Sequence, residues 1–162
     1  MPNRRPVTLT PLSQISALKS SPGVEGWRAS GNDPQFLMSW GSPSLSAGWY
    51  VLSGTAEVMR GRLHSPSLYP SYGRGPHEQD RVDLPFAVSG SQSLMFSALA
   101  RFHSTVTALR FDPSVSSVDF HLDGLSLRRV GKAEALKIMM GTLLERRRGL
   151  TAAAHLLGRT AL

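Results

Sequence analysis

The spacing of apolar residues in this chain changes abruptly at Gly131. Before this glycine, apolar and polar residues alternate with a period of two, which is typical of half-buried β-strands. After it, apolar residues recur at intervals of three and four, which is typical of one face of an α-helix. The pattern therefore predicts a β-rich body followed by a single C-terminal helix.

The positive charge of the chain is concentrated after nearly the same point in the sequence. Residues 128–162 contain eight Lys or Arg and two Glu, a balance of +6 out of the total formal charge of +7, so residues 1–127 carry only +1. A nearly neutral body must bury a core, whereas a cationic amphipathic helix needs a partner. Because the aromatic residues of the body are not interleaved with Lys or Arg, we do not expect nucleic acid as a partner.

The body is predicted to contain about eight strands. They are expected within residues 12–18, 25–29, 35–40, 48–59, 82–88, 93–99, 105–112 and 117–130. No helical pattern separates them, so the fold class is mainly β: an antiparallel β-sandwich of the jelly-roll type, followed by a C-terminal amphipathic α-helix.

More detailed predictions concern two of these strands. In residues 48–59, Tyr50, Leu52, Ala56 and Val58 share one face, whereas Trp49, Val51, Ser53, Thr55 and Glu57 share the other. In residues 117–130, the apolar alternation ending at Leu122 resumes at Leu125, one residue out of phase. The glycine between them, Gly124, predicts a β-bulge.

The expected domain organisation has three parts. Residues 1–10 form a basic leader, residues 11–130 form the sandwich domain, and residues 131–162 form the cationic helix and its tail. Residues 65–80 are rich in Pro, Gly and Tyr, which predicts a long surface loop. Long loops in compact domains are often functional.

Composition excludes several classes of site. The chain has no cysteine, so it has no disulfide, thiolate zinc site or cysteine nucleophile. Its N-terminus lacks the apolar run of a signal peptide, and no segment approaches the roughly 20 apolar residues of a membrane span. We therefore expect a cytoplasmic location, including the inner face of the membrane.

Aromatic residues are the candidates for ligand binding, because an aromatic face packs well against the C–H surface of a sugar ring. Our hypothesis assigns the stacking surface to Trp40, Tyr69 and Tyr72, and the polar contacts to His77, Glu78 and Arg110. The alternatives are ordinary core or rim packing for the aromatic residues, and a surface ion pair for Arg110.

Enzyme activity on sugars is a less favoured hypothesis than binding alone. His77, Glu78 and Asp80 form a compact polar cluster that could act on sugars, but no catalytic motif accompanies them. We therefore expect no enzyme activity and no cofactor. The remaining scattered carboxylates, Asp33, Asp112 and Asp123, could hold calcium but also suit turns, so no metal site is predicted.

The helix is expected to span residues 132–157. Its predicted interaction residues are Leu136, Met140, Leu143, Arg146, Arg147, Arg148 and Leu150. Gly141 and Gly149 each weaken the helix by about 1 kcal/mol relative to alanine, so it requires something to pack on. The candidates are the sandwich, a second copy of the chain, an anionic membrane surface beside the arginine run, or a following domain.

Short motifs recur in a characteristic order between Trp27 and Val130. They are Trp27-x-Ala29, Asp33-Pro34-Gln35-Phe36, Ala47-Gly48-Trp49-Tyr50, Leu68-Tyr69-Pro70 with Tyr72-Gly73-x-Gly75, Leu109-Arg110-Phe111-Asp112-Pro113 and Phe120-x-Leu122-x-x-Leu125-x-Leu127. Together they resemble the N-terminal β-sandwich modules that precede glycosyltransferase domains in bacterial O-antigen and surface-polysaccharide synthesis. The last motif is also similar to the closing strand of jelly-roll carbohydrate-binding modules.

This resemblance implies a non-catalytic accessory or carbohydrate-recognition module, with a glycan or a glycosyltransferase domain as its partner. It also implies that the helix connects to a catalytic domain. The chain departs from the family pattern at Ser71, where an acidic residue is common before the position of Tyr72. The alternative function is a structural interaction domain that docks or dimerises through its C-terminal helix.

Overall fold

The structure is a computed structural model that describes residues 4–19, 25–90 and 92–158. The chain divides into two compact units, Met1–Arg129 and Val130–Leu162, and each is described by itself. The strands are β1 (Arg4–Pro6), β2 (Thr8–Ser13), β3 (Ile15–Lys19), β4 (Glu25–Ala29), β5 (Gln35–Ser39), β6 (Gly48–Leu63), β7 (Ser67–Ser71), β8 (Val82–Asp83), β9 (Val88–Ser89), β10 (Gln92–Phe102), β11 (Ala108–Asp112) and β12 (Val118–Val130). A short 3₁₀ turn, η1 (Glu78–Asp80), precedes β8, and the helix α1 (Lys132–Gly158) follows β12.

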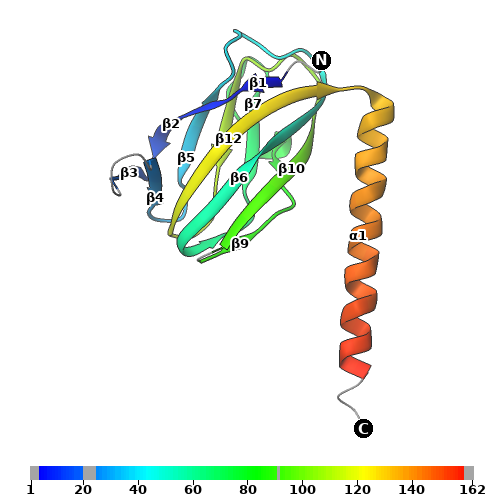
Figure 1. Ribbon diagram of the computed structural model, residues 1–162. Coiled ribbons are helices and arrows are strands. Elements are labelled where there is room, and N and C mark those ends of the chain that lie inside the picture. Colours follow the sequence, from blue (N-terminus) through cyan, green and yellow to red (C-terminus); the bar gives the residue numbers. More distant parts are fainter. Residues whose placement is uncertain (1–3, 20–24, 91, 159–162) are drawn as a thin grey trace. The chain divides into compact units, whose positions relative to one another are not determined.

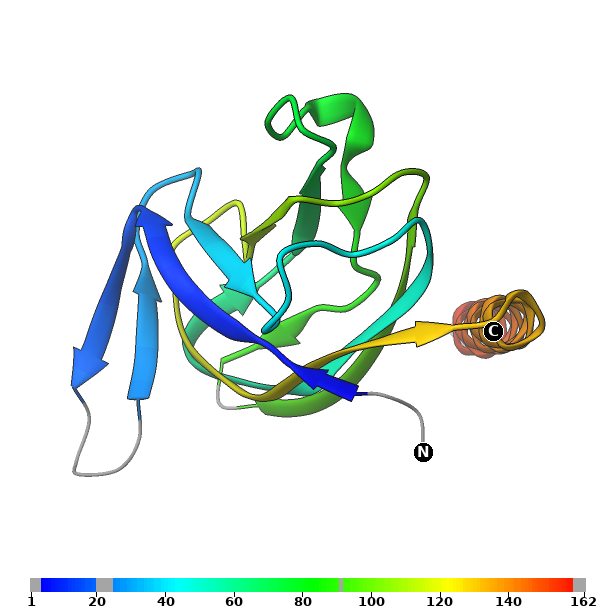
Figure 2. The ribbon, with the colours of Figure 1, turned by 90° about the horizontal axis from the view of Figure 1, so that it is seen from above.

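The strands form two antiparallel layers (Figures 1 and 2). A seven-stranded sheet has the order β10-β6-β12-β4-β3, with β1 paired to β12 and β9 paired to β6. A five-stranded sheet has the order β2-β5-β11-β7-β8. The expected mainly β fold, an antiparallel sandwich followed by one helix, is confirmed.

The hydrophobic core lies between the two sheets, and an aromatic cluster within it contacts both sheets. Phe36 of β5 meets Trp27 of β4 edge to face, with ring centroids 5.2 Å apart. It also meets Phe120 of β12 at 6.2 Å, in a second edge-to-face contact. Because β5 belongs to one sheet while β4 and β12 belong to the other, Phe36 connects the layers.

The face assignment of β6 is confirmed. Tyr50, Leu52, Ala56 and Val58 are all buried in the core. The alternating residues therefore face the outer side of the seven-stranded sheet. The long, regular pairing of β6 with β10, from Gly48↔Phe102 to Val58↔Gln92, keeps this alternation in phase.

The phase slip predicted in β12 is present at Gly124. Gly124 has a φ of +59°, a conformation that glycine adopts without steric cost. Leu122 and Leu125 on either side of it both pack against the core, although they are three residues apart. The phase of the strand therefore slips by one residue at this glycine.

The N-terminal residues differ from the expected leader, because residues 4–10 belong to the sandwich. Strand β1 pairs with β12, and β2 pairs with β5. Pro6 and Pro11 interrupt the sequence pattern, but each lies in a strand that has a paired neighbour on one side only. Such edge positions tolerate a proline, since its nitrogen need not donate a hydrogen bond.

The expected surface loop at residues 65–80 contains a buried strand. All five residues of β7 are buried, and the strand pairs with β11 on one side and β8 on the other. Leu68 faces the core, where it is fully buried. The high content of Pro, Gly and Tyr is typical of a loop, so the sequence did not predict this strand. Only residues 72–80 form the turns and η1.

The helix is close to its expected extent. Leu136, Met140 and Leu143 are 57%, 51% and 55% exposed, and Arg146 and Arg147 are exposed as well. The side chains of Arg148 and Leu150 lie outside the described residues. Among the described residues, no helix combines the length and apolar character that crossing a membrane requires.

Candidate ligand-binding site

Trp40, the first of the predicted stacking residues, lies in the hydrophobic core just after β5. It is only 5% exposed. One part of it lines a hollow of about 300 Å³ together with Met38, Pro43 and Thr107. Its indole Nε1 has no hydrogen-bond partner within the described part of the chain. A ring enclosed in this way does not present an open face to a sugar.

Tyr69, Arg110 and Glu78 do come together, on the outer side of the five-stranded sheet. Tyr69 in β7 and Arg110 in β11 are partners in register, and the guanidinium lies 4.1 Å from the centre of the tyrosine ring. The Tyr69 hydroxyl donates a hydrogen bond to Glu78 Oε2 at 3.3 Å. Burial raises the pKa of this hydroxyl. Arg110 therefore occupies the ring face that a sugar would need.

Arg110 also forms the ion pair that the sequence left as an alternative. Its Nη2 donates to Asp112 Oδ2 at 2.9 Å. Within the described residues, Asp112 Oδ1 is buried without a hydrogen-bond partner. Burial raises the pKa of the Asp112 carboxyl to about 6, and the attraction of Arg110 offsets this only in part.

We expect Asp112 to make the protein less stable as the pH rises from 3.8 to about 6. In this window the folded state retains a proton that the unfolded state has released, so raising the pH disfavours folding. The measurement is the free energy of unfolding in urea at several pH values, for the wild type and Asp112→Asn. The stability of the wild type relative to the variant should fall across the window, and an increase would contradict the expectation.

Tyr72, His77 and the neighbouring polar residues lie around η1. Tyr72 is half-buried and packs against His103, with ring centroids 4.0 Å apart. His77 is exposed, and Asp80 Oδ1 lies 3.3 Å from His103 Nε2. The described residues include no group of three or more His, Asp or Glu side chains that could hold a metal ion.

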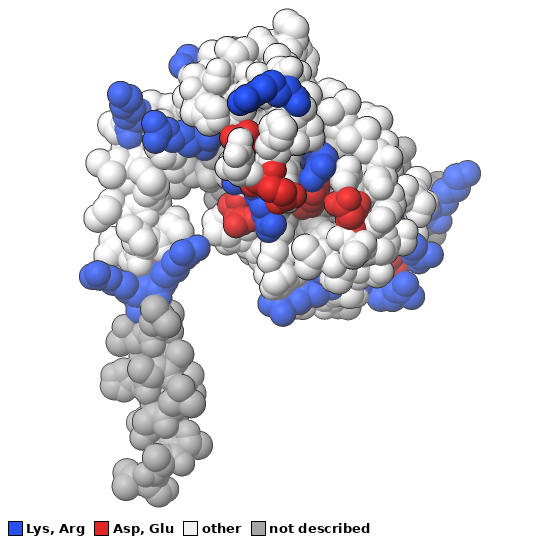
Figure 3. All heavy atoms as spheres, turned by 180° about the vertical axis from the view of Figure 1, so that it is seen from behind, with Lys and Arg blue, Asp and Glu red and all other residues white. Residues whose placement is uncertain are grey.

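Acidic side chains gather on this side of the body (Figure 3). Asp33 and Glu78 both act electrostatically on Asp112, which places three carboxyl groups near one another. Asp123, the remaining carboxylate considered for calcium, lies in β12 of the other sheet. The five-stranded side therefore holds most of the predicted ligand-binding residues in an internally paired, acidic cluster.

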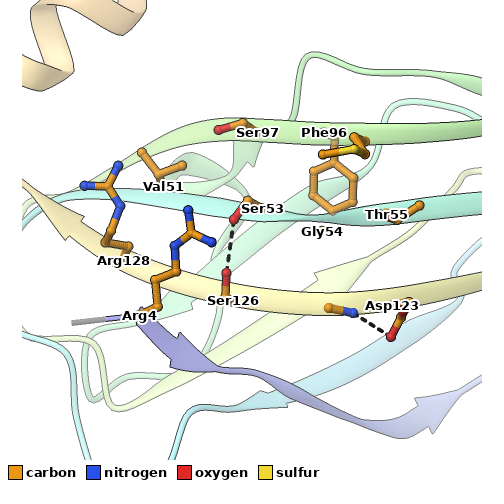
Figure 4. Close-up of a pocket in the computed structure, with 12 residues that line it drawn as sticks. Arg4, Val51, Ser53, Gly54, Thr55, Phe96, Ser97, Asp123, Ser126 and Arg128 are labelled. Carbon is orange, nitrogen blue, oxygen red and sulfur yellow. Dashed lines mark hydrogen bonds between the residues drawn. The ribbon is translucent and has the colours of Figure 1, made fainter. Parts of the chain in front are cut away.

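A larger open groove of about 450 Å³ lies on the outer face of the seven-stranded sheet (Figure 4). Its lining comes from β1, β6, β10 and β12. The hydroxyl side chains in it are Ser53, Thr55, Ser97 and Ser126, and the charged ones are Arg4, Asp123 and Arg128. Phe96 and Gly54 contribute to the floor.

The hydroxyl groups form a row across three adjacent strands. Ser53 of β6 is the register partner of Ser97 of β10, and its Oγ lies 3.0 Å from the Oγ of Ser126 in β12. Neighbouring strands are about 4.8 Å apart, so the row covers roughly 10 Å. Small side chains keep the floor low, whereas Met95 beside the row is 84% exposed.

Strand β6 continues from the hydroxyl row toward Trp49, at one end of the sheet. Trp49 and Arg101 are register partners on the same outer face, and the guanidinium of Arg101 lies 5.4 Å from the centre of the Trp49 ring. Trp49 is half-buried. Residues two apart in a strand are about 6.8 Å apart, so Trp49 lies two such steps from Ser53.

The sequence did not identify this groove, although it placed Ser53 and Thr55 together on one face of their strand. The useful signal was a serine or threonine on the outer face of several strands. That signal has meaning only once β6, β10 and β12 are known to be neighbours. Strand order is not contained in the alternation pattern of any single strand.

Comparison with known proteins adds evidence on the fold. No protein-family model and no curated protein sequence matches the chain. Among solved structures, the CBM22-1 xylan-binding domain of Paenibacillus barcinonensis Xyn10C is similar, with a TM-score of 0.50 and 12% sequence identity over 75% of this chain and 85% of that chain. The body has a β-sandwich fold like that of carbohydrate-binding modules.

Two further structures are similar at slightly lower scores. The carbohydrate-binding module CBM6cm-2 of Cellvibrio mixtus lichenase 5A, in complex with cellotriose, has a TM-score of 0.49 and 5% identity over 81% of this chain and all of that chain (100%). The family 29 module CBM29_1 from Piromyces equi has a TM-score of 0.48 and 8% identity over 78% and 87% of the two chains. At these identities the likeness concerns the fold alone.

Proposed function

We propose that this chain is a carbohydrate-recognition module that binds a glycan on the outer face of its seven-stranded sheet. The observation that carries the proposal is the row of Ser97, Ser53 and Ser126 across the groove. A serine hydroxyl both donates and accepts hydrogen bonds, as a sugar hydroxyl does. The groove volume of about 450 Å³ lies in the range of small-molecule sites.

The proposed activity is binding without catalysis. Most glycoside hydrolases use two carboxyl groups on either side of the scissile bond. Asp123 is the one carboxylate lining the groove among the described residues. Its Oδ1 accepts a hydrogen bond from the Gly124 N–H at 2.8 Å, which holds it beside the bulge. This arrangement supports recognition of a sugar rather than its cleavage.

The fold likeness supports the ligand class. The similar structure with a TM-score of 0.50 is named a xylan-binding domain. We carry over only the general class, carbohydrate, because the sequence identity of 12% gives no basis for transferring a particular sugar.

Filling the groove is expected to abolish binding. Ser97→Trp places a large ring over the hydroxyl row, so glycan binding on an array and by calorimetry should fall at least tenfold. Ser93→Trp is the matched control, because Ser93 is an exposed residue of the same strand outside the groove lining. Binding that survives Ser97→Trp, or that is lost instead in Tyr72→Ala, would reject the groove in favour of the five-stranded side.

We further propose that the module serves bacterial surface-polysaccharide synthesis beside a glycosyltransferase. The support for this context is that the sequence from Trp27 to Val130 resembles the modules that precede glycosyltransferase domains. The fold likeness does not bear on this context, because it concerns carbohydrate-binding modules. The basic helix α1 would then be the connection to the transferring enzyme.

A second candidate function is docking to another chain through α1. It is favoured by the exposure of Leu136, Met140, Leu143 and Leu144, which are between 51% and 57% exposed. Exposed apolar side chains in a row are typical of interaction surfaces. We place this function second because these side chains alone do not define the chemistry of a partner.

A further inference from the structure

One end of the groove brings two arginine residues together. Arg4 of β1 and Arg128 of β12 are direct cross-strand partners, and both side chains line the groove. Figure 4 shows the two guanidinium groups on the same side of the sheet, next to Ser53 and Ser126. The fold therefore places two guanidinium groups side by side at this end of the groove.

Arg4 is not neutralised by a nearby acid. It is exposed, and no carboxylate of the described residues lies within 4.0 Å of its guanidinium. Strand β1 contains only three residues. A carboxylate bound by Arg4 and Arg128 together would therefore link β1 to β12.

The acidic residue of the groove lies away from this pair. Asp123 and Arg128 are five residues apart in β12, which corresponds to at most about 16 Å along the strand. Figure 4 shows Asp123 on the far side of the groove from the two arginine residues. The gathering of acidic side chains in Figure 3 belongs to the other side of the body. One end of the groove is thus cationic, and the hydroxyl row begins beside it.

We propose that the groove recognises an acidic glycan, a chain that contains uronic acid residues, with a sugar carboxylate bound by Arg4 and Arg128. This inference rests on the proposed function, because the hydroxyl row must hold the neutral part of the same ligand. A guanidinium binds a carboxylate through two parallel hydrogen bonds, a geometry that matches the planar acid group of a uronate. Ser53 and Ser126 then lie next to the bound carboxylate and contact the sugar hydroxyls.

The test compares two probes with the same backbone, an oligogalacturonate and its fully methyl-esterified form. Calorimetry with the full chain should show that the free acid binds roughly 10- to 100-fold more tightly, the range expected for hydrogen bonds to charged groups. Raising the salt concentration should weaken binding of the free acid and leave the ester unchanged, because salt screens exposed charges.

The variant Arg4→Gln should remove most of the preference for the free acid while retaining binding of the ester. Arg74→Gln is the matched control, since it removes one positive charge from an exposed turn outside the groove. Equal affinity of the wild type for both probes, or binding of neutral oligosaccharides only, overturns the acidic-glycan inference and leaves the proposed function standing. Failure to bind any acidic or neutral glycan overturns both.

Discussion

Replacing Phe36 with alanine is expected to lower the free energy of unfolding by about 3–5 kcal/mol. The side chain has 0% of its surface exposed, and it contacts aromatic rings of both sheets. Its removal leaves a cavity between layers that cannot close without moving whole strands. Urea unfolding followed by tryptophan fluorescence measures the loss, and Trp27 next to Phe36 provides a local signal.

The control for this experiment is the neighbouring residue on the other face of the same strand. Leu37 is only half-buried, so Leu37→Ala should cost about 1 kcal/mol or less. Phe36→Leu, which retains most of the apolar volume, should lie between the two. Similar losses for Phe36→Ala and Leu37→Ala would mean that β5 does not present Phe36 to a packed interface between the sheets.

The second large effect is expected for Gly61→Ala near the end of β6. Gly61 has a φ of +84°, and an added Cβ would lie 2.7 Å from the carbonyl oxygen of Ser117. The variant therefore combines the cost of a left-handed conformation, about 1–2 kcal/mol, with a backbone clash at the start of β12. We expect a total loss of about 3 kcal/mol or more in the free energy of unfolding.

Gly41 separates these two costs. It also has a positive φ, +71°, but an added Cβ would meet nothing within 4 Å. Gly41→Ala should therefore show the conformational cost alone, about 1–2 kcal/mol. The difference between the two variants, measured by chemical unfolding, gives the cost of the close approach between β6 and β12. A difference near zero would contradict the close approach at Gly61.

The elements that were predictable from sequence are those whose signal is local. The alternation in β6 separated its two faces, and the apolar pattern of β12 located the phase slip at Gly124, because both patterns lie within one strand. The helical period after Gly131 likewise located α1. Each of these follows from the geometry of a single element.

The elements that were missed depend on partners elsewhere in the chain. Strand β7 contains Pro70 and resembles a loop, but pairing with β11 and β8 stabilises it from both sides. Strand β1 contains three residues and owes its position to β12, which lies more than one hundred residues later. Such pairing is a property of the fold, and the sequence around either strand does not contain it.

The candidate site shows the same limit. The aromatic residues Trp40 and Tyr69 attracted attention because aromatic rings commonly bind sugars, yet both are buried. The groove instead depends on serine residues from three strands, none of which is distinctive by itself. Cross-strand register brings Ser53 and Ser97 together, and register can be read only from the assembled sheet.

The direct continuity of β12 with the helix has a mechanical consequence. β12 has hydrogen-bonded neighbours on both flanks, and only Gly131 separates its last residue from α1. A pulling force applied through α1 would therefore load the ladders on both sides of this strand in shear, so that many hydrogen bonds resist together. A peripheral strand would instead peel away one bond at a time, so a force applied at α1 reaches the body at a strand that resists tension well.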